Sequence, residues 1–319
     1  YAFENTSGRG QFGLTFDAFG RRFFCSNRHP VMQIMLEPAH LARNPHLSFS
    51  ESVQEVSKVQ AEAAVFPISR ASITADFIPS LMAAPHAGTF TSASGVFIFG
   101  GTGLTPEHQG NVFICESAQN LVQRQVLRPE GAAFRSDPPA AGKEFLASTD
   151  VWFRPVFLGE GPDGALYLAD MYRREIDHPR YVPLESRALL DFESGKDRGR
   201  IYRIVRATPT PSADDATYRD RRDDLTKTVR ALESPDEWWR ADAQRRLVER
   251  ADRAAVPLVE TIAAQATRAE SRTRALWTLH GLHSLTTPTI AAALNDPHPG
   301  VREQALHFAG ELIARGQGA

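Results

Sequence analysis

The chain contains the stretch Gly161-Pro162-Asp163-Gly164-Ala165-Leu166-Tyr167-Leu168-Ala169-Asp170-Met171-Tyr172-Arg173-Arg174. Its first four residues favour a tight turn, because proline presets its own backbone angle and glycine tolerates positive φ. The apolar residues that follow alternate as in a strand with one buried face. The strand then ends in a dense group of charged and aromatic residues. Repeated units of this kind are typical of β-propellers, which carry their chemistry at strand ends and in loops.

Two earlier runs share this pattern. Residues 22–26 and 111–116 also follow a glycine-containing turn, and each ends in a small residue followed by a polar one. Such repetition favours propeller blades over a single sandwich. With four strands to a blade, residues 1–206 would hold roughly three or four blades. The sequence therefore predicts a partial, truncated β-propeller, and we expect the remaining blades to precede Tyr1.

The rest of the chain has a helical repeat. The pattern Arg-x-x-Ala, followed four residues later by Leu or Ala, begins at Arg240, Arg272 and Arg302, about 30 residues apart. Ser234-Pro235-Asp236 and residues 296–299 are helix-start signals, with a cap residue and a proline in the first turn. An arginine near a helix start is expected to bind the preceding turn. This texture predicts a HEAT-like α-solenoid.

The strand pattern and the helical repeat divide the chain into two parts. We expect a dehydrogenase-like propeller over residues 1–206, a proline-rich linker over 207–221 and helical repeats over 222–319. Because the last repeat lacks a polar capping helix, we expect the protein to continue beyond Ala319.

Composition excludes few function classes. The 319 residues carry a formal net charge of -2, which favours neither nucleic acid nor an anionic membrane surface as a partner. No apolar run approaches the roughly 20 residues that span a bilayer. Cys25 and Cys115 cannot form a disulfide framework; small buried residues or a single pair are the two interpretations. The C-x-x-C-H, HExxH, P-loop and GxGxxG patterns are absent.

Several segments together resemble a known family. They are residues 13–17, 22–27, 110–116, 120–122, 152–154, 161–173, 178–181 and 197–203. They resemble large proteins of planctomycete- and verrucomicrobium-type bacteria that are described as membrane-bound dehydrogenases or haem-binding proteins. More distantly, they are similar to sugar and sorbosone dehydrogenase propellers. Residues 161–173 carry the most specific part of the resemblance.

The resemblance implies a function. In that family a propeller is followed by HEAT-like helices and then by a c-type cytochrome domain. It implies a periplasmic or otherwise extracytoplasmic oxidoreductase that oxidises a sugar or related alcohol. Electrons would pass to a PQQ-like quinone, to haem, or to both, and any haem c would sit on a domain outside this chain.

The candidate site lies around the 161–174 stretch. The predicted catalytic residues are Asp170, His178 and Arg154, and the predicted substrate-binding residues are Tyr172, Arg173, Asp150 and His29. A carboxylate and a guanidinium could orient hydroxyls, and a histidine could accept a proton during oxidation. The alternative is an Asp–Arg network that holds neighbouring blades together, with Tyr172 packed under a loop. We expect no metal site.

Other features have two interpretations each. Asp163 marks a hairpin turn rather than a calcium loop. Residues 100–103, Gly-Gly-Thr-Gly, form a tight turn or cradle an anion through backbone N–H groups. Trp238 and Trp239 close the join between the two parts of the chain, or form a binding hot spot.

A second function class fits the same features. Propellers and solenoids also serve as non-catalytic scaffolds, so the fold alone does not choose between them. In this alternative the chain binds a carbohydrate or polyol, or holds a protein partner on its helices.

Overall fold

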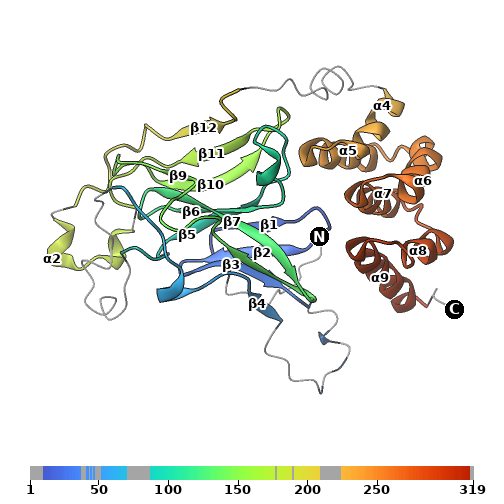
Figure 1. Ribbon diagram of the computed structural model, residues 1–319, viewed down its shortest axis with the longest axis horizontal. Coiled ribbons are helices and arrows are strands. Elements are labelled where there is room, and N and C mark those ends of the chain that lie inside the picture. The colour runs from blue at the N-terminus through green and yellow to red at the C-terminus, as the bar shows by residue number, and fades with distance from the viewer. Residues whose placement is uncertain are drawn as a thin grey trace.

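The computed structural model describes residues 10–36, 41, 42, 44, 46, 52–69, 87–176, 178–188, 190–208 and 224–316. Strands fill one side of the molecule and the helices that follow residue 224 fill the other, while a short helix at 184–187 lies beyond the strands at the left of Figure 1. The strands are β1 (Leu14–Phe16), β2 (Arg22–Ser26), β3 (His29–Ile34), β4 (Val53–Glu55), β5 (Ala93–Ile98), β6 (Val112–Glu116), β7 (Leu121–Glu130), β8 (Ala133–Asp137), β9 (Leu146–Ala147), β10 (Pro155–Glu160), β11 (Leu166–Asp170) and β12 (Arg200–Ile204). The helices are α2 (Leu184–Arg187), α4 (Leu225–Arg230), α5 (Glu237–Glu249), α6 (Val256–Gln265), α7 (Ala269–Gly281), α8 (Thr287–Ala293) and α9 (Pro299–Ala314).

The strands form antiparallel sheets by pairing with their neighbours in sequence. The first sheet has the order β1-β2-β3-β4, the second β5-β6-β7-β8 with β9 added to β7, and the third β10-β11-β12. The expected strands at 22–26, 111–116 and 165–170 are confirmed as β2, β6 and β11. Gly164 lies in the turn before β11 and has a φ of +69°, as the predicted turn requires.

The expected arrangement of the strands and helices was wrong. The sequence predicted a partial β-propeller followed by a HEAT-like α-solenoid. The described residues instead form three separate antiparallel sheets that close into neither a barrel nor a propeller, and the helices beside them do not make a clear solenoid. A glycine turn followed by an alternating strand specifies hairpin pairing only. It carries no information about how many sheets form or whether they close into a ring.

Two apolar clusters hold the sheets together. Phe23, Val31 and Phe90 belong to the cluster shared by the first and second sheets. Phe113 and Leu168 belong to the cluster between the second and third. In β11 every second residue is buried, and Leu166 and Leu168 pack in the second of these clusters, which accounts for the period-two pattern of that strand.

The helices pack through the repeated arginines and alanines. The guanidinium of Arg272 donates to the carbonyl of Ala266, and that of Arg302 donates to the carbonyl of Asp296, each at 2.7 Å. Arg240 makes the equivalent bond to the Ser234 carbonyl at 2.5 Å. The expectation that these arginines bind the preceding turn is therefore confirmed. The alanines at 243, 275 and 305 are buried, which lets α5, α7 and α9 approach one another.

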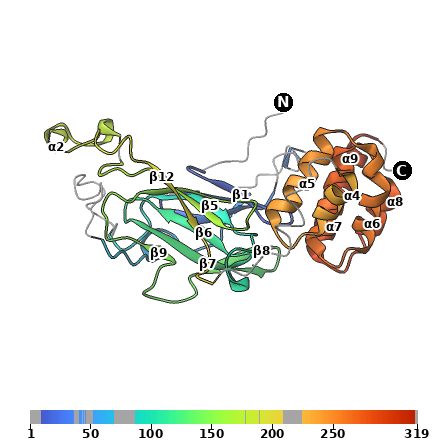
Figure 2. The ribbon, with the colours of Figure 1, turned by 90° about the horizontal axis from the view of Figure 1, so that it is seen from above.

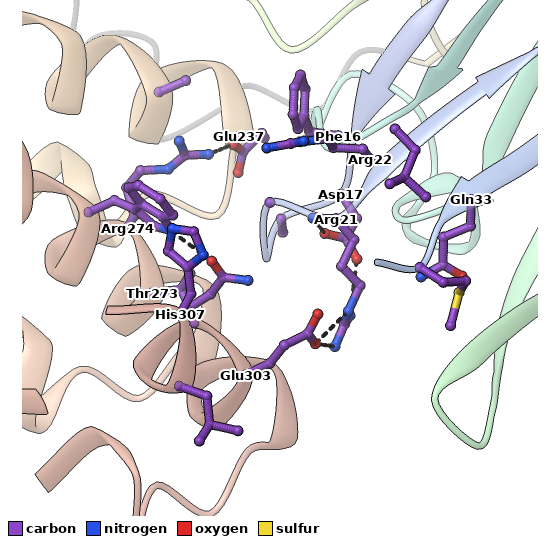
Figure 3. Close-up of a pocket in the computed structure, with 18 of the residues that line it drawn as sticks. Phe16, Asp17, Arg21, Arg22, Gln33, Glu237, Thr273, Arg274, Glu303 and His307 are labelled. Atoms are coloured by element: carbon purple, nitrogen blue, oxygen red, sulfur yellow. Dashed lines mark hydrogen bonds and ion pairs between the residues drawn. The ribbon is translucent and has the colours of Figure 1, made fainter. Parts of the chain in front are cut away.

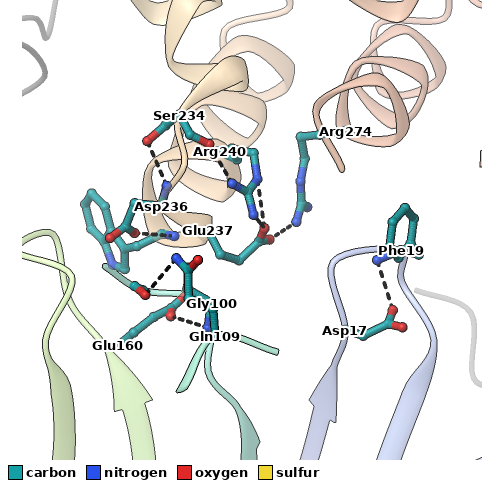
Figure 4. A network of polar contacts seen from close by, with 12 residues as sticks. Asp17, Phe19, Gly100, Gln109, Glu160, Ser234, Asp236, Glu237, Arg240 and Arg274 are labelled. Atoms are coloured by element: carbon teal, nitrogen blue, oxygen red, sulfur yellow. Dashed lines mark hydrogen bonds and ion pairs between the residues drawn. The ribbon is translucent and has the colours of Figure 1, made fainter. Parts of the chain in front are cut away.

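The N-terminus of α5 joins the helices to the sheets (Figure 4). Asp236 caps α5 by accepting from the Trp238 amide, and its other oxygen accepts from the amide and the hydroxyl of Thr102 at 3.1 and 3.0 Å. The Glu237 amide also donates to the Gly100 carbonyl at 3.2 Å. We call residues 100–103 the Gly100 loop. One carboxylate therefore both starts the helix and fixes it to the second sheet.

A second contact joins α9 to the turn between β1 and β2. Phe19 stacks on the His298 ring, with centroids 4.6 Å apart, and Gly300 lies directly against the Phe19 ring. Arg21 reaches Glu303 on α9 at 2.6 Å. The helices are thus held at two separated points, and Figure 2 shows them lying beside the sheets.

Two further sequence expectations concern the linker between the two parts of the chain and membrane-spanning segments. The predicted linker at 207–221 lies, from residue 209 on, outside the described residues. No helix in the described part of the chain is long and apolar enough to cross a membrane.

The close approach of Gly100 to Glu237 gives a test of the contact between the Gly100 loop and α5. A Cβ at residue 100 would lie 2.5 Å from the Glu237 Cβ, whereas at Gly159 the nearest atom would be 3.9 Å away, at the edge of the Phe157 ring. Gly100→Ala should therefore destabilise the chain by about 1 to 3 kcal/mol, and Gly159→Ala by less. Thermal unfolding of both variants measures this, and equal stability of the two would contradict the proposed join.

Candidate functional site

A cavity lies between the two points at which the helices contact the sheets (Figure 3). It has a volume of about 850 Å³, and its walls come from β1, β3 and the β1–β2 turn on one side and from α5, α7 and α9 on the other. We call it the cleft. Its size and its position between two structural units are typical of small-molecule sites.

Charged groups of the cleft are paired with opposite charges, and one of these pairs, Arg21 with Glu303, crosses the cleft. Arg21 bonds Asp17 at 3.1 Å and Glu303 at 2.6 Å. On the α5 wall Glu237 bonds Arg240 at 2.6 Å and is also paired with Arg274. Opposite charges therefore balance along the lining, which favours a ligand without net charge.

Within the described residues, two polar oxygens of the cleft lining have no hydrogen-bond partner. They are Oε1 of Gln33, on β3, and Oγ1 of Thr273, on α7, and both atoms are almost fully shielded from solvent. Buried polar atoms are nearly always bonded, so a ligand in the cleft that reaches either atom after a side-chain rotation would supply the missing bond. Trp277 lines the same cleft and donates through its indole N–H to Gln304 at 3.1 Å.

None of the seven predicted site residues lines the cleft. Arg154, predicted to be catalytic, is 3% exposed and bonds main-chain carbonyls from two directions. Its guanidinium donates to Ser117 at 3.1 Å, to Ala118 at 2.8 Å and to Arg173 at 2.9 Å, and also to the Arg174 carbonyl. Arg154 therefore connects the loop after β6 to the loop after β11.

Three more predicted residues lie with Arg154 at the end of β11. Asp170 accepts from the amides of Arg154 and Tyr172, both at 2.8 Å. Its second oxygen is buried and makes no hydrogen bond. Tyr172 has a φ of +50° and lies between Trp152 and the guanidinium of Arg200. Arg173 is half-buried and bonds the carbonyls of Met171 and Tyr172.

The structure does not bring the other three predicted residues into this group. His178 caps a short 3-10 helix, its ring accepting from the Arg180 amide, and is exposed. Asp150 accepts from the Trp152 amide within its own turn. His29, in the first sheet, bonds Glu55 at 2.8 Å. Each makes local contacts that stabilise a turn or a strand pair.

Sequence reasoning missed Glu116, which is fully buried at the end of β6. Its carboxylate accepts from the amides of Thr91 and Ser92 at 3.0 and 2.8 Å. Burial raises its pKa to about 7, although those amides and the nearby Arg154 oppose the rise. The available signal was its position, because Glu116 follows its strand just as Asp170 follows β11.

Three of the remaining two-way interpretations are answered, while that of Trp238 and Trp239 stays a prediction. Cys25 and Cys115 are free and buried. Asp163 lies in the expected hairpin turn and bonds Arg203 at 2.5 Å. The Gly100 loop is a close-packed turn: a Cβ at Gly101 or Gly103 would meet the Gly164 carbonyl at 2.5 or 2.6 Å. Within the described residues, no group of three or more His, Cys, Asp or Glu could hold a metal ion.

A family model covers the sheets. It is described as a domain of unknown function, DUF7133, and it matches residues 1–208, about two thirds of the chain. The chain belongs to the DUF7133 family. No curated protein and no solved structure matches it. The DUF7133 segment ends just after β12, so the cleft has one wall inside the family domain and one wall outside it.

Glu160 lies where the DUF7133 domain meets α5. Its carboxylate accepts from the Gly100 amide at 3.0 Å. Burial, with the negative Asp236 and Glu237 beside it, raises the pKa of Glu160 to about 8. The side chain is therefore largely protonated at neutral pH.

Arg154 and Arg173 offer a matched pair of substitutions. Arg154→Leu removes the guanidinium bonds to four main-chain carbonyls in a buried site and should cost about 3 to 5 kcal/mol. Arg173→Leu removes only weak local bonds and should cost less than about 1 kcal/mol. Chemical denaturation compares them. Equal losses, or a stable Arg154→Leu protein, would contradict the structural role of Arg154.

The raised pKa of Glu160 predicts a pH dependence. A carboxyl with a pKa higher in the folded than in the unfolded state stabilises the fold below the unfolded pKa of 4.5, and that contribution is lost as pH rises toward 8. Glu160→Gln should remove this loss, reducing the decline in unfolding free energy between pH 5 and pH 8 by about 2 to 4 kcal/mol. Glu62→Gln, at an exposed position, is the control. An unchanged pH profile in Glu160→Gln would refute the assignment.

Proposed function

We propose that this chain is a binding module whose cleft takes a neutral carbohydrate or polyol. The observation that carries the proposal is the pair of unpartnered buried oxygens, Gln33 Oε1 and Thr273 Oγ1, on opposite walls of the cleft. Ligand hydroxyl groups can donate to both atoms, and water-excluded hydroxyl–amide bonds are worth most where the acceptor is otherwise unsatisfied.

The rest of the cleft suits the same ligand class. Trp277 and Phe16 offer aromatic surface against which the apolar face of a sugar ring can pack. Planar side chains such as those of Glu237 and Arg274 can bind two adjacent hydroxyls at once. Because the lining arginines are already matched by carboxylates, an anionic sugar would gain little over a neutral one.

The predicted catalytic residues favour this function over a dehydrogenase. Arg154 donates to main-chain carbonyls, and His178 is the exposed N-cap residue of a short 3-10 helix. Sugar oxidation with transfer of electrons to a quinone or haem, in an extracytoplasmic compartment, stays a prediction of the family resemblance. Sugar-dependent dye reduction that is lost in Asp170→Ala would support it.

Two buried hydroxyls on α7 test the binding function. Ser271 and Thr273 each carry a buried hydroxyl oxygen without a partner, but only Thr273 lines the cleft. In calorimetric titrations with neutral oligosaccharides, a polyol and a uronic acid, Thr273→Val should weaken binding of the best neutral ligand about tenfold. Ser271→Ala should leave it unchanged.

Two results would contradict the proposal. One is that no member of the panel binds at millimolar concentration. The other is that Thr273→Val and Ser271→Ala behave alike, which would place the ligand outside the cleft.

A further inference from the structure

Within the described residues, the third sheet has three strands in a row where each of the other two has four. In the first sheet β4 pairs with the outer edge of the third strand, β3, and in the second sheet β8 pairs with β7. In the third sheet the third strand is β12, and within the described residues it pairs only with β11. β12 forms the uppermost edge of the sheets in Figure 1.

The exposure of β12 matches a missing neighbour. Its first four residues are exposed, whereas the central residues of β3 and the first residues of β7 are buried. Ile201 is 74% exposed, which is unusual for a branched apolar residue in a strand. An edge of this kind presents unpaired N–H and C=O groups that can pair with another strand.

A fourth strand would complete two side-chain rows. On one face Phe157, Ala169 and Ile201 lie side by side across the sheet, with Phe157 61% exposed. On the other face Leu158 and Leu168 are buried, and Tyr202 continues their row at the edge. Apolar residues placed opposite Ile201 and Tyr202 would extend both rows.

The positive charge along the edge of β12 determines which kind of strand can pair with it. Arg198 and Arg200 are exposed, and Arg203 is exposed although it bonds Asp163. Antiparallel pairing of β12 with β12 of a second copy would bring two such arginine-rich edges together, which is unfavourable. An acidic strand gains from the same charges.

We propose that the free edge of β12 binds an extended acidic peptide segment as a fourth, antiparallel strand. Its core has the pattern acidic–apolar–apolar–acidic, with the two apolar residues opposite Tyr202 and Ile201 and the acidic ones opposite Arg203 and Arg200. Main-chain hydrogen bonds supply the affinity, and the side-chain pattern supplies the selectivity. This site is separate from the cleft and does not depend on its ligand.

The probe is a nine-residue fluorescent peptide with the central sequence Glu-Val-Val-Glu between serine and threonine flanks. Titrated with the full 319-residue chain, its anisotropy should show saturable binding. Methylation of alternate backbone nitrogens should abolish binding, and a Lys-Val-Val-Lys peptide should bind at least about tenfold more weakly. Hydrogen exchange should slow at residues 198–206 when the acidic peptide is bound.

A charge reversal provides the matched variants. Arg200→Glu should weaken the acidic peptide at least about tenfold and strengthen the lysine peptide. Arg128→Glu, the same change at an exposed position on β7, should alter neither. Circular dichroism and thermal unfolding confirm that each variant is folded.

Several outcomes would overturn the proposal. They are absence of binding at millimolar peptide, binding that survives backbone methylation, binding that is indifferent to Arg200→Glu, or protection away from β12. Self-association of the chain that Ile201→Lys abolishes would overturn it too, since the occupant would then be a second copy.

Discussion

The arrangement of this chain depends on the attachment of the α5 N-terminus to the Gly100 loop. Asp236 completes the first turn of the helix and bonds Thr102 with the same carboxylate, so helix formation and domain docking share one group. The loop can lie this close to Glu237 because Gly100 has no side chain, and Gly101 and Gly103 let it lie equally close to the Gly164 carbonyl on its other side. With α5 fixed, the helices packed on it are placed opposite β1 and β3, and the cleft exists because of that placement.

Local features could be predicted from the sequence, and long-range ones could not. The strands β2, β6 and β11, the caps at Asp236 and before Pro299, and the arginines that bind the preceding turn all follow from residues a few positions apart. Ring closure depends on how sheets pack on each other, which a hairpin pattern does not specify. The predicted propeller failed for that reason. The helix repeat likewise specifies contacts between neighbouring turns and helices, but not the overall stacking that a solenoid requires.

The candidate site shows the same limit. Polar residues after a strand favour a functional loop, and Asp170 and Arg154 do lie together. Their hydrogen-bond partners, however, are main-chain groups. The Arg154 guanidinium bonds carbonyls in the loops after β6 and β11, and Asp170 accepts from amides of its own sheet and loop. These contacts are of the structural kind that the alternative interpretation expected. The cleft joins residues near 17, 33, 237, 273 and 303, which share no motif and meet only in the folded chain. DUF7133 covers the sheet wall alone, so binding in the cleft would require the helices as well.

Hydrogen exchange of the full chain, with and without a mixture of neutral oligosaccharides, tests the central claim most directly. If the cleft binds the ligand, exchange slows on both walls together, at residues 16–22 and 33–36 and at 241–244 and 273–277. Slower exchange at residues 150–178 instead would place the function at the end of β11 and contradict this account. An unchanged exchange pattern would remove the support for a carbohydrate ligand.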